Sequence, residues 1–307
     1  MRAFIFPGQG SQKVGMGAEL AQASAVARDV FGEVDEALGQ HLFKLMAEGP
    51  DDQLVMTANA QPAIMAHSIA VLRTMGIDLS AKADFVAGHS LGEYSALAAA
   101  GTFGLAETAK LLRIRGDAMQ AAVPVGVGSM AALLGVDIAK AEEIAAACAE
   151  GEVCEVANDN DPGQVVLSGH ASAIDRVVER AKDMGAKRAI KLPVSAPFHC
   201  SLMQPAADRM AEALGGASMH APSVTLYANV TAAPTSDPDA IRDQLVSQVT
   251  GRVRWRESVA AMADTGVTQF VEVGGKVLGP MVKKIAPDAA TVSLVTMDDI
   301  ENFAKEL

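Results

Sequence analysis

A serine stands in the middle of the segment Gly88-His89-Ser90-Leu91-Gly92, between a short apolar stretch and an alanine-rich one. This spacing of serine between two glycines is typical of a nucleophile elbow, a sharp strand-to-helix turn that strains the serine backbone and exposes its hydroxyl. The free N–H groups at the start of the following helix point at any oxyanion that forms nearby. We therefore predict that Ser90 is a catalytic nucleophile. A glycine-flanked loop serine without chemistry is the alternative.

A serine nucleophile needs a base within hydrogen-bonding distance, and histidine is the usual one. The chain has six histidines: His41, His67, His89, His170, His199 and His220. His89 adjoins the serine, and we expect its side chain to point away from the hydroxyl. His199 stands out because it follows Ser195-Ala196-Pro197-Phe198, a constrained junction between a loop and a helix. These residues alone leave open whether His199 is a base or a structural histidine.

An arginine lies on an apolar helix face. In the predicted helix Leu105–Ala122, residues four apart share a face, so Arg115 lies between Leu111 and Met119. A guanidinium there must either extend to water or meet an anion, because an unpaired buried charge is costly. A carboxylate-bearing substrate would suit its planar pair of donors. An internal salt bridge with one of the 37 acidic residues carries equal weight.

Alternating strands and helices must position these residues. The first elements are a predicted strand, Ala3–Phe6, a helix, Gln61–Met75, and a second strand, Asp84–Ala87. The helix has Pro62 in its first turn and Gly76 just after its end, which are the usual start and stop residues. This alternation favours a mostly parallel sheet covered by helices.

The order of elements changes in the middle of the chain. Between residues 127 and 193 it reads βαββαβ, which is the split-βαβ or ferredoxin-like unit. The first pattern then resumes, with Pro234–Asp239 interpreted as a loop. We therefore expect an α/β protein in which a large discontinuous catalytic domain, residues 1–126 and 194–307, carries a small inserted subdomain, residues 127–193.

The composition of the 307 residues excludes several classes of protein. Half of the residues are hydrophobic, which excludes a disordered chain, and no apolar run reaches the roughly 20 residues that span a bilayer. With 25 basic and 37 acidic residues, the net charge of −12 argues against a nucleic-acid partner. Three irregularly spaced cysteines and a very short apolar N-terminus indicate a cytoplasmic protein with reduced thiols.

Two glycine-rich segments resemble nucleotide-binding loops only superficially. Gly8–Gly17 lacks the Gly-Lys-Ser/Thr sequence that ends a phosphate loop, and Gly126–Ala131 precedes a predicted strand where a dinucleotide site would follow one. The cysteines and histidines show no metal-ligand spacing. We therefore expect neither a nucleotide cofactor nor a metal.

Several sequence blocks occur together and in a fixed order: FPGQGSQ (6–12), QPA (61–63), GHSLGEYSAL (88–97), RG (115–116), NDNDPGQVVLSG (158–169), PVSAPFHCSLM (193–203) and VEVGGKVL (271–278). With these blocks the chain closely resembles the malonyl-CoA:acyl carrier protein transacylase family of bacterial fatty acid synthesis and related acyltransferase domains, over essentially its whole length. The resemblance implies an α/β-hydrolase-like parallel-sheet core with a ferredoxin-like insert, acyl-carrier-protein S-malonyltransferase activity, and no cofactor.

The resemblance also implies catalytic roles. Ser90 would be the acylated nucleophile of a ping-pong reaction that moves malonyl from malonyl-CoA to the phosphopantetheine thiol of acyl carrier protein. His199 would be its general base and acid, oriented by a main-chain carbonyl at the position of Gln248. The backbone N–H groups of Gln9 and Leu91 would form the oxyanion hole.

In the same way, the resemblance implies a binding pocket for the malonyl group. Arg115 would hold the free carboxylate, and Gln61 and Asn160 would line the pocket. Asp159 and Asp161 flank Asn160 and add negative charge near a pocket that is expected to admit an anion.

The carrier protein is strongly acidic in this family, so a chain of net charge −12 needs a local basic patch to attract it. Residues 179–191 hold five basic side chains against Glu179 and Asp183. We expect the carrier to dock near Lys187, Arg188 and Lys191; a merely solvated face carries equal weight. We also expect a monomer.

Two other functions compete with acyl transfer. A serine esterase or thioesterase uses the same elbow but usually places its histidine near the C-terminus, whereas residues 200–307 still follow His199 here. A non-catalytic carrier-binding protein would not need Ser90, His199 and Arg115 together.

Overall fold

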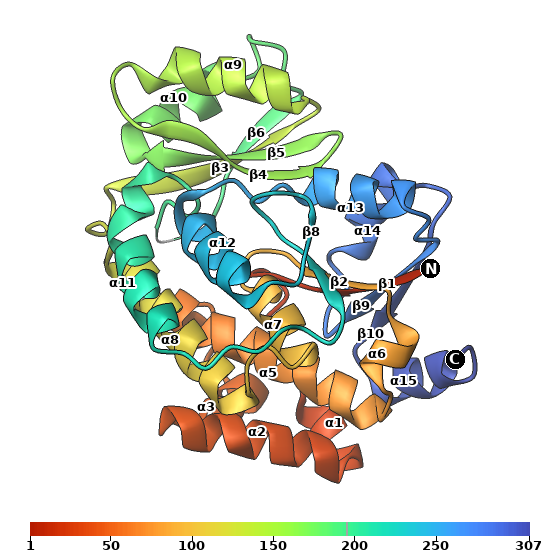
Figure 1. Ribbon diagram of the computed structural model, residues 1–307. Coiled ribbons are helices and arrows are strands. Elements are labelled where there is room, and N and C mark those ends of the chain that lie inside the picture. The colour runs from red at the N-terminus through yellow and green to blue at the C-terminus, as the bar shows by residue number, and fades with distance from the viewer. Residues whose placement is uncertain (195) are drawn as a thin grey trace.

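The computed structural model describes residues 1–194 and 196–307; Ser195, in the predicted junction before His199, lies outside the described residues. The chain forms a mixed α/β structure with two separate sheets (Figure 1). The larger sheet has the order β10-β9-β1-β2-β7-β8 and is parallel except for its last pair. Its strands are β1 (Arg2–Phe6), β2 (Phe85–Gly88), β7 (Thr225–Tyr227), β8 (Pro234–Thr235), β9 (Gln269–Val273) and β10 (Ala290–Leu294).

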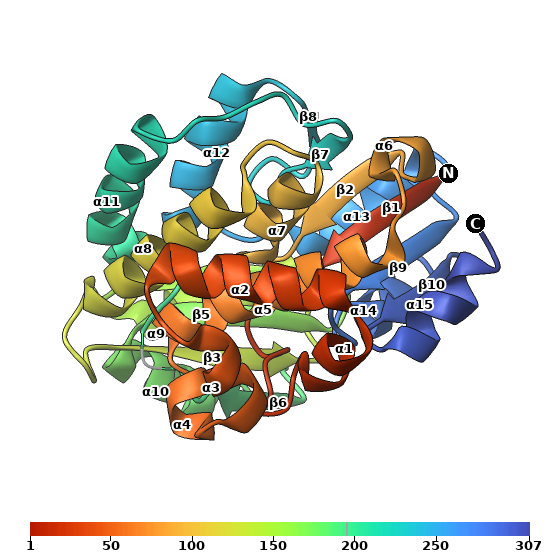
Figure 2. The same cartoon turned by 90° about the horizontal axis from the view of Figure 1, so that it is seen from below.

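Helices cover both faces of this sheet, which is why its central strands are almost wholly buried (Figures 1 and 2). Phe4 and Phe6 of β1 belong to the main core, while Ala3 and Ile5 face a second core. The second core is formed with α13 (Trp255–Asp264) and α14 (Gly279–Ile285). The helices of the main face are α1 (Ala18–Ala23), α2 (Ala25–Leu38), α3 (Leu42–Glu48), α4 (Asp51–Leu54), α5 (Thr57–Met75), α6 (Leu79–Lys82), α7 (Gly92–Ala99), α8 (Leu105–Ala121), the 3-10 turn η1 (Ser201–Met203), α11 (Gln204–Gly215), α12 (Pro238–Thr250) and α15 (Met297–Ala304).

The smaller sheet is antiparallel and has the order β4-β5-β3-β6. Ala131 and Leu133 of β3 point into a separate small core, while Met130 and Ala132 belong to the main core, as the two-residue period of a strand requires. In Figure 1 two helices cover its outer face at the top of the molecule. The elements of this part are β3 (Gly128–Leu134), α9 (Ile138–Ala149), β4 (Cys154–Asp161), β5 (Gln164–His170), α10 (Ala171–Arg180) and β6 (Arg188–Lys191).

Two sequence predictions about local structure are wrong. Helix α5 begins at Thr57, one turn before the predicted start, so Pro62 lies inside the helix and removes one backbone hydrogen bond. The predicted loop Pro234–Asp239 contains β8 and the start of α12, where the Asp237 side chain accepts from a backbone N–H and Pro238 is the first helical residue. The order of strands and helices around the elbow is otherwise as predicted. No helix in the described part of the chain has the length and apolarity to cross a membrane.

Candidate active site

Ser90 lies in a tight turn between β2 and α7. Its φ angle of 53° is left-handed, which is uncommon for a residue with a side chain. The flanking glycines are required by close contacts, because a Cβ atom on Gly88 would lie 1.9 Å from the carbonyl of Gly92, and one on Gly92 would lie 2.2 Å from the carbonyl oxygen of Phe6. The strained strand–turn–helix geometry that the spacing predicts is therefore present at Ser90.

The side chain of Asn229 holds this turn in place. Its Oδ1 accepts a hydrogen bond from the backbone N–H of Ser90 at 2.8 Å, and its Nδ2 donates to the carbonyl of Gly88 at 2.6 Å. Asn229 is buried two residues after the end of β7, the strand next to β2. The sequence analysis missed this residue, because only the pairing of β2 with β7 brings it to the elbow.

Ser90 and His199 form a hydrogen-bonded pair that ends on a backbone carbonyl. Ser90 Oγ lies 2.7 Å from His199 Nε2, and His199 Nδ1 lies 2.8 Å from the carbonyl oxygen of Gln248. Because a carbonyl only accepts, Nδ1 carries the hydrogen and Nε2 is free to accept from the serine hydroxyl. Burial, with a contribution from the Arg115 guanidinium, lowers the pKa of His199 to about 3. The imidazole is therefore neutral at physiological pH and available as a base.

Arg115 reaches the same point from α8 and is buried on the apolar face between Leu111 and Met119, so its guanidinium does not extend to water. Its two Nη atoms donate to Gln61 Oε1 at 2.7 Å, to Gln248 Oε1 at 2.8 Å and to Ser90 Oγ at 3.1 Å. All three partners are uncharged, so its positive charge is not neutralised by a direct ion pair. Burial lowers the pKa of the Arg115 guanidinium, because the charged form is costly to keep out of water. This site would gain from the arrival of an anion.

A buried carboxyl group, Glu93, lies behind this arrangement. Gln248 Nε2 donates to Glu93 Oε2 at 2.6 Å and to the Ser90 carbonyl at 3.0 Å. Burial raises the pKa of Glu93 to about 7, against the lowering effect of its hydrogen bonds and of Arg115. Gln248 thus orients His199 through its backbone and links Arg115 to Glu93 through its side chain. The sequence analysis missed Glu93, although it stands three residues after the serine.

A cavity of about 560 Å³ opens over Ser90 and is large enough for an extended thioester arm. Gln9 and Leu91 contribute to its wall, and in the described part of the chain neither backbone N–H has a hydrogen-bond partner. Both groups are therefore free to bind an oxyanion. The other lining residues include Gln61, Met119, Met130, Asn158, Leu192, Pro193, Val194 and Phe198.

Asn160, which was expected in the pocket, lies behind its wall. Its side chain bonds to His89 Nε2 at 2.8 Å, and Asn158 is the asparagine that lines the cavity. The neighbouring Asp159 and Asp161 do not add free negative charge to the pocket, because each is buried against a cation. Asp159 pairs with Arg256 at 2.8 Å and Asp161 with Lys284 at 2.9 Å.

The side chains of the described residues contain no group of three histidine, cysteine or acidic residues that could hold a metal ion. The three cysteines are free and buried, and burial raises the pKa of the Cys200 thiol, next to His199, to about 11. The polar groups around the Ser90 hydroxyl are thus the His199 imidazole, the Arg115 guanidinium and their amide partners, with the Glu93 carboxyl group behind them. This set suits acyl transfer to and from a serine, with selection for an anionic acyl group.

Comparison with known proteins points the same way. Residues 3–278 match the acyl transferase domain family. The chain is 44% identical over 306 residues to the malonyl CoA-acyl carrier protein transacylase of Escherichia coli strain K12, covering 99% of both chains. It is 53% identical to the crystal structure of an acyl-carrier-protein S-malonyltransferase from Bartonella henselae, with a TM-score of 0.97 and coverage of 99% and 98%.

A further similar structure is that of a malonyl-transacylase in complex with its type II PKS acyl-carrier protein. It is 37% identical, with a TM-score of 0.95, and the match covers 100% of this chain and 99% of that one. The similarity to enzymes of this type therefore extends over the full length of the sequence and of the fold.

Proposed function

The chain belongs to the malonyl CoA-acyl carrier protein transacylase family of acyl transferases, and we propose that it moves the malonyl group from malonyl-CoA to the phosphopantetheine thiol of acyl carrier protein through a malonyl-Ser90 intermediate. The observation that carries the proposal is the environment of one oxygen atom. Ser90 Oγ lies 2.7 Å from the neutral His199 imidazole and 3.1 Å from the buried Arg115 guanidinium. A nucleophile placed between a base and a cation suits an acyl group that carries its own negative charge.

In the first half-reaction, Ser90 Oγ attacks the thioester carbonyl carbon of malonyl-CoA while His199 Nε2 takes the hydroxyl proton. The carbonyl oxygen becomes an oxyanion that the N–H groups of Gln9 and Leu91 stabilise, each by about 3 kcal/mol. The carbon–sulfur bond then breaks, and the departing CoA sulfur receives the proton from His199. These steps use only groups of the chain and the substrate, so no cofactor is required.

The second half-reaction repeats these steps with a different thiol. The phosphopantetheine thiol of the carrier gives its proton to His199 and attacks the malonyl-Ser90 ester. The serine oxygen leaves and recovers the proton, which regenerates the free enzyme. Water competes at this stage, so the carrier arm must fill the cavity and exclude it.

We propose that the free carboxylate of the malonyl group binds Arg115. Gln61 and Gln248 accept hydrogen bonds from different Nη atoms and fix the plane of the guanidinium. The Thr57 hydroxyl accepts from Gln61 Nε2 at 2.9 Å and donates to the side chain of Gln9 at 3.1 Å. The same chain of hydrogen bonds therefore connects the carboxylate site to the segment that supplies an oxyanion N–H.

We interpret residues 1–126 and 194–307 as an α/β-hydrolase-like catalytic domain and residues 127–193 as a ferredoxin-like subdomain. The antiparallel sheet order and the βαββαβ sequence of elements support this division.

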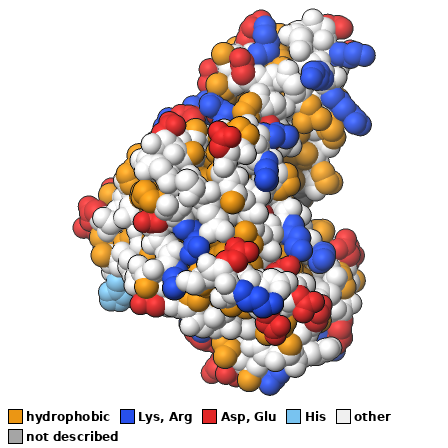
Figure 3. All heavy atoms as spheres, turned by 90° about the vertical axis from the view of Figure 1, so that its right-hand side faces the viewer, with side chains coloured by type: hydrophobic (Ala, Val, Ile, Leu, Met, Phe, Trp, Pro, Cys, Tyr) orange, Lys and Arg blue, Asp and Glu red, His pale blue; other side chains and the backbone are white. Residues whose placement is uncertain are grey.

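We further propose that the carrier docks on the smaller sheet beside the cavity mouth. Lys187, just before β6, and Arg188, its first residue, are exposed, and the strand leads directly into Leu192–Val194, which line the cavity. Figure 3 shows basic side chains gathered on the upper part of the molecule, which holds this sheet. Lys191 contributes less than expected, because it is paired with Asp175 at 2.6 Å.

Intact-mass spectrometry after mixing with malonyl-CoA tests the proposed activity. We expect a malonyl adduct on the wild-type chain that disappears when holo-carrier protein is added and reappears as malonyl-carrier. Ser90→Ala should give no adduct, and His199→Ala should slow its formation by at least about 10³-fold, since the serine loses its base. Rapid release of free malonate without the carrier would instead indicate a hydrolase. Absence of any adduct would indicate a binding protein.

A further inference from the structure

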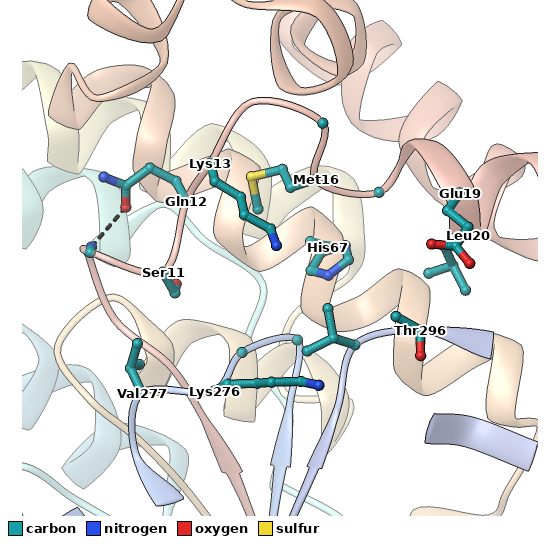
Figure 4. Close-up of a pocket in the computed structure, with 16 residues that line it drawn as sticks. Ser11, Gln12, Lys13, Met16, Glu19, Leu20, His67, Lys276, Val277 and Thr296 are labelled. Carbon is teal, nitrogen blue, oxygen red and sulfur yellow. Dashed lines mark hydrogen bonds between the residues drawn. The ribbon is translucent and has the colours of Figure 1, made fainter. Parts of the chain in front are cut away.

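A second cavity, of about 420 Å³, lies beside the active site on the other side of the segment Gly8–Gly17. Gly10 and Gln12 border both cavities. Three loops form most of the second cavity, namely Gly10–Gly17 after β1, Gly274–Val277 after β9, and Val295 and Thr296 after β10 (Figure 4). None of the functions assigned above uses this cavity.

The position of this cavity in the sheet is one where α/β proteins commonly bind ligands. Strands β1 and β9 are parallel neighbours, but the chain leaves them toward opposite faces. After β1 it continues into α1 and α5 on the main face, and after β9 into α14 on the second face. Loops that diverge in this way leave a crevice at the carboxyl ends of the strands, which is the favoured ligand site of an open parallel sheet.

One buried polar atom in the wall of this crevice has no partner. His67 of α5 is 2% exposed, and its buried Nδ1 atom makes no hydrogen bond with any described residue. Burial, with a contribution from Lys13, lowers the pKa of His67 to about 4, so the imidazole is neutral. A buried polar atom without a partner costs free energy, which a hydrogen bond to a ligand or to its associated water would recover.

Two lysines extend toward the same space. In Figure 4 the side chains of Lys13 and His67 point toward each other across the cavity, and Lys276 runs along its lower edge. Lys13 has no carboxylate partner among the described residues. Lys276 lies 3.6 Å from Asp299, whose Oδ2 already accepts two backbone N–H groups at the start of α15. Both ammonium groups therefore retain capacity for an added anion.

We propose that this crevice is a second ligand site, which binds a small molecule through a phosphate or carboxylate group held by Lys13 and Lys276, with His67 at its base. Glu19 lies on the far side of the cavity from Lys13 in Figure 4. A hydroxyl or amino group at the other end of the ligand would therefore find an acceptor there. The site is independent of malonyl transfer, although it shares the Gly8–Gly17 segment that also carries Gln9.

Isothermal titration calorimetry with pyrophosphate, inorganic phosphate and citrate tests the site. We expect saturable binding of at least one probe to the wild-type chain and at least tenfold weaker binding to Lys13→Gln and to Lys276→Gln. Lys110→Gln, which removes an exposed lysine of α8, is the matched control and should bind normally. Preference for the phosphates or for citrate identifies which oxyanion the site takes. No binding of any probe, or equal loss in the control, would overturn the proposal.

Two further measurements separate this site from the active site. In Ser90→Ala, which cannot be acylated, saturating malonyl-CoA should leave probe affinity unchanged within about twofold; displacement would assign the cavity to the substrate and overturn the proposal. On the wild-type chain, nitrogen-15 histidine spectra should show the probe shifting the His67 ring signals but not those of His199. A shift at His199 alone would also refute the site. Both measurements can be interpreted whether or not the chain transfers malonyl groups, so failure of the second site and failure of the proposed activity can be told apart.

Discussion

Arg115 at the active site and the two aspartates at the junction of the two sheets, Asp159 and Asp161, are buried to a similar degree, but their charges are satisfied differently. At the junction, Asp159 and Asp161 of β4 each meet a cation from the second face of the large sheet, Arg256 or Lys284. At the active site, Arg115 is bonded only to uncharged groups. A neutralised pair holds two parts of the protein together, whereas an unneutralised buried charge attracts a ligand of opposite sign.

The largest effect that this comparison predicts is on substrate choice. Arg115→Ala should lower kcat/KM for malonyl loading by about 10²- to 10³-fold, which corresponds to the loss of a desolvated, charge-assisted pair. Loading from acetyl-CoA should not fall, because an acetyl group has no carboxylate to bind. Rates of acyl-Ser90 formation followed by mass spectrometry give both values.

Arg113→Ala is the control for Arg115→Ala. Arg113 lies on the same helix, is half-buried and bonds to Asn59 at 2.9 Å, but it does not line the cavity. It should leave the ratio of malonyl to acetyl loading unchanged. An equal loss of both substrates in Arg115→Ala would make that arginine structural and erase the proposed difference between the two regions.

At the junction the expected effect is on stability alone. Arg256→Ala leaves Asp159 buried without its cation and should lower the free energy of unfolding by about 2 kcal/mol, less than a fully enclosed pair because the arginine is partly exposed. Denaturant unfolding measures this loss. The malonyl-to-acetyl ratio of the folded variant should equal that of the wild type; a changed ratio would show that the junction contributes to selectivity.

These two regions also differ in how much of them the sequence predicts. The elbow is specified locally, because the glycines at 88 and 92 stand at a fixed spacing from Ser90. Arg115 follows from helical periodicity, which places it between two residues that are indeed buried. Such features need only neighbours along the chain, so one sequence suffices to find them.

Contacts that depend on strand pairing could not be predicted in this way. Asn229 reaches the elbow because β7 lies next to β2, and Asp159 meets Arg256 because β4 packs on α13. The role of the Gln248 carbonyl came from family resemblance, since any backbone carbonyl could serve. Local signals also mislead where two of them conflict. Pro62 indicates a helix start, but the helix continues back to Thr57, which is buried.

An effect of similar size, visible only as a dependence of stability on pH, is expected from the acid behind the active site. Burial raises the pKa of Glu93 to about 7, above the 4.5 of an exposed glutamate, so the folded chain holds the proton more tightly. The stability contributed by this group is therefore present below pH 4.5 and is lost as the pH rises through 7. Glu93→Gln removes that loss, so its stability relative to wild type should increase by about 1–3 kcal/mol between pH 5 and pH 8.

Unfolding midpoints at several pH values measure this trend. His199 gives the opposite slope, because its lowered pKa makes the unfolded chain bind more protons below pH 6.5, but His199 is present in both proteins and cancels in the comparison. A flat difference between Glu93→Gln and wild type would mean that Glu93 is ionised in the folded chain. Arg115 would then have a charged neighbour, contrary to the comparison above.

The smallest expected effect concerns the exposed charges of Lys187 and Arg188 at the start of β6, which we propose bind the carrier and do not stabilise the fold. Lys187→Glu or Arg188→Glu should raise KM for the carrier protein by about 3- to 10-fold at low salt, since each reversal repels an acidic partner that docks on this edge of the smaller sheet. Lys191→Glu should have a weaker effect, because Asp175 already neutralises that lysine. Lys305→Glu makes the same charge change at the C-terminus, far from β6 in Figure 1, and should have no effect on KM.

Steady-state transfer and malonyl-CoA loading must be measured together, because loading does not involve the carrier and should stay constant. Equal KM values in Lys187→Glu, Arg188→Glu and Lys305→Glu would show that the basic edge is only a solvated surface, with the carrier reaching Ser90 across another side of the cavity.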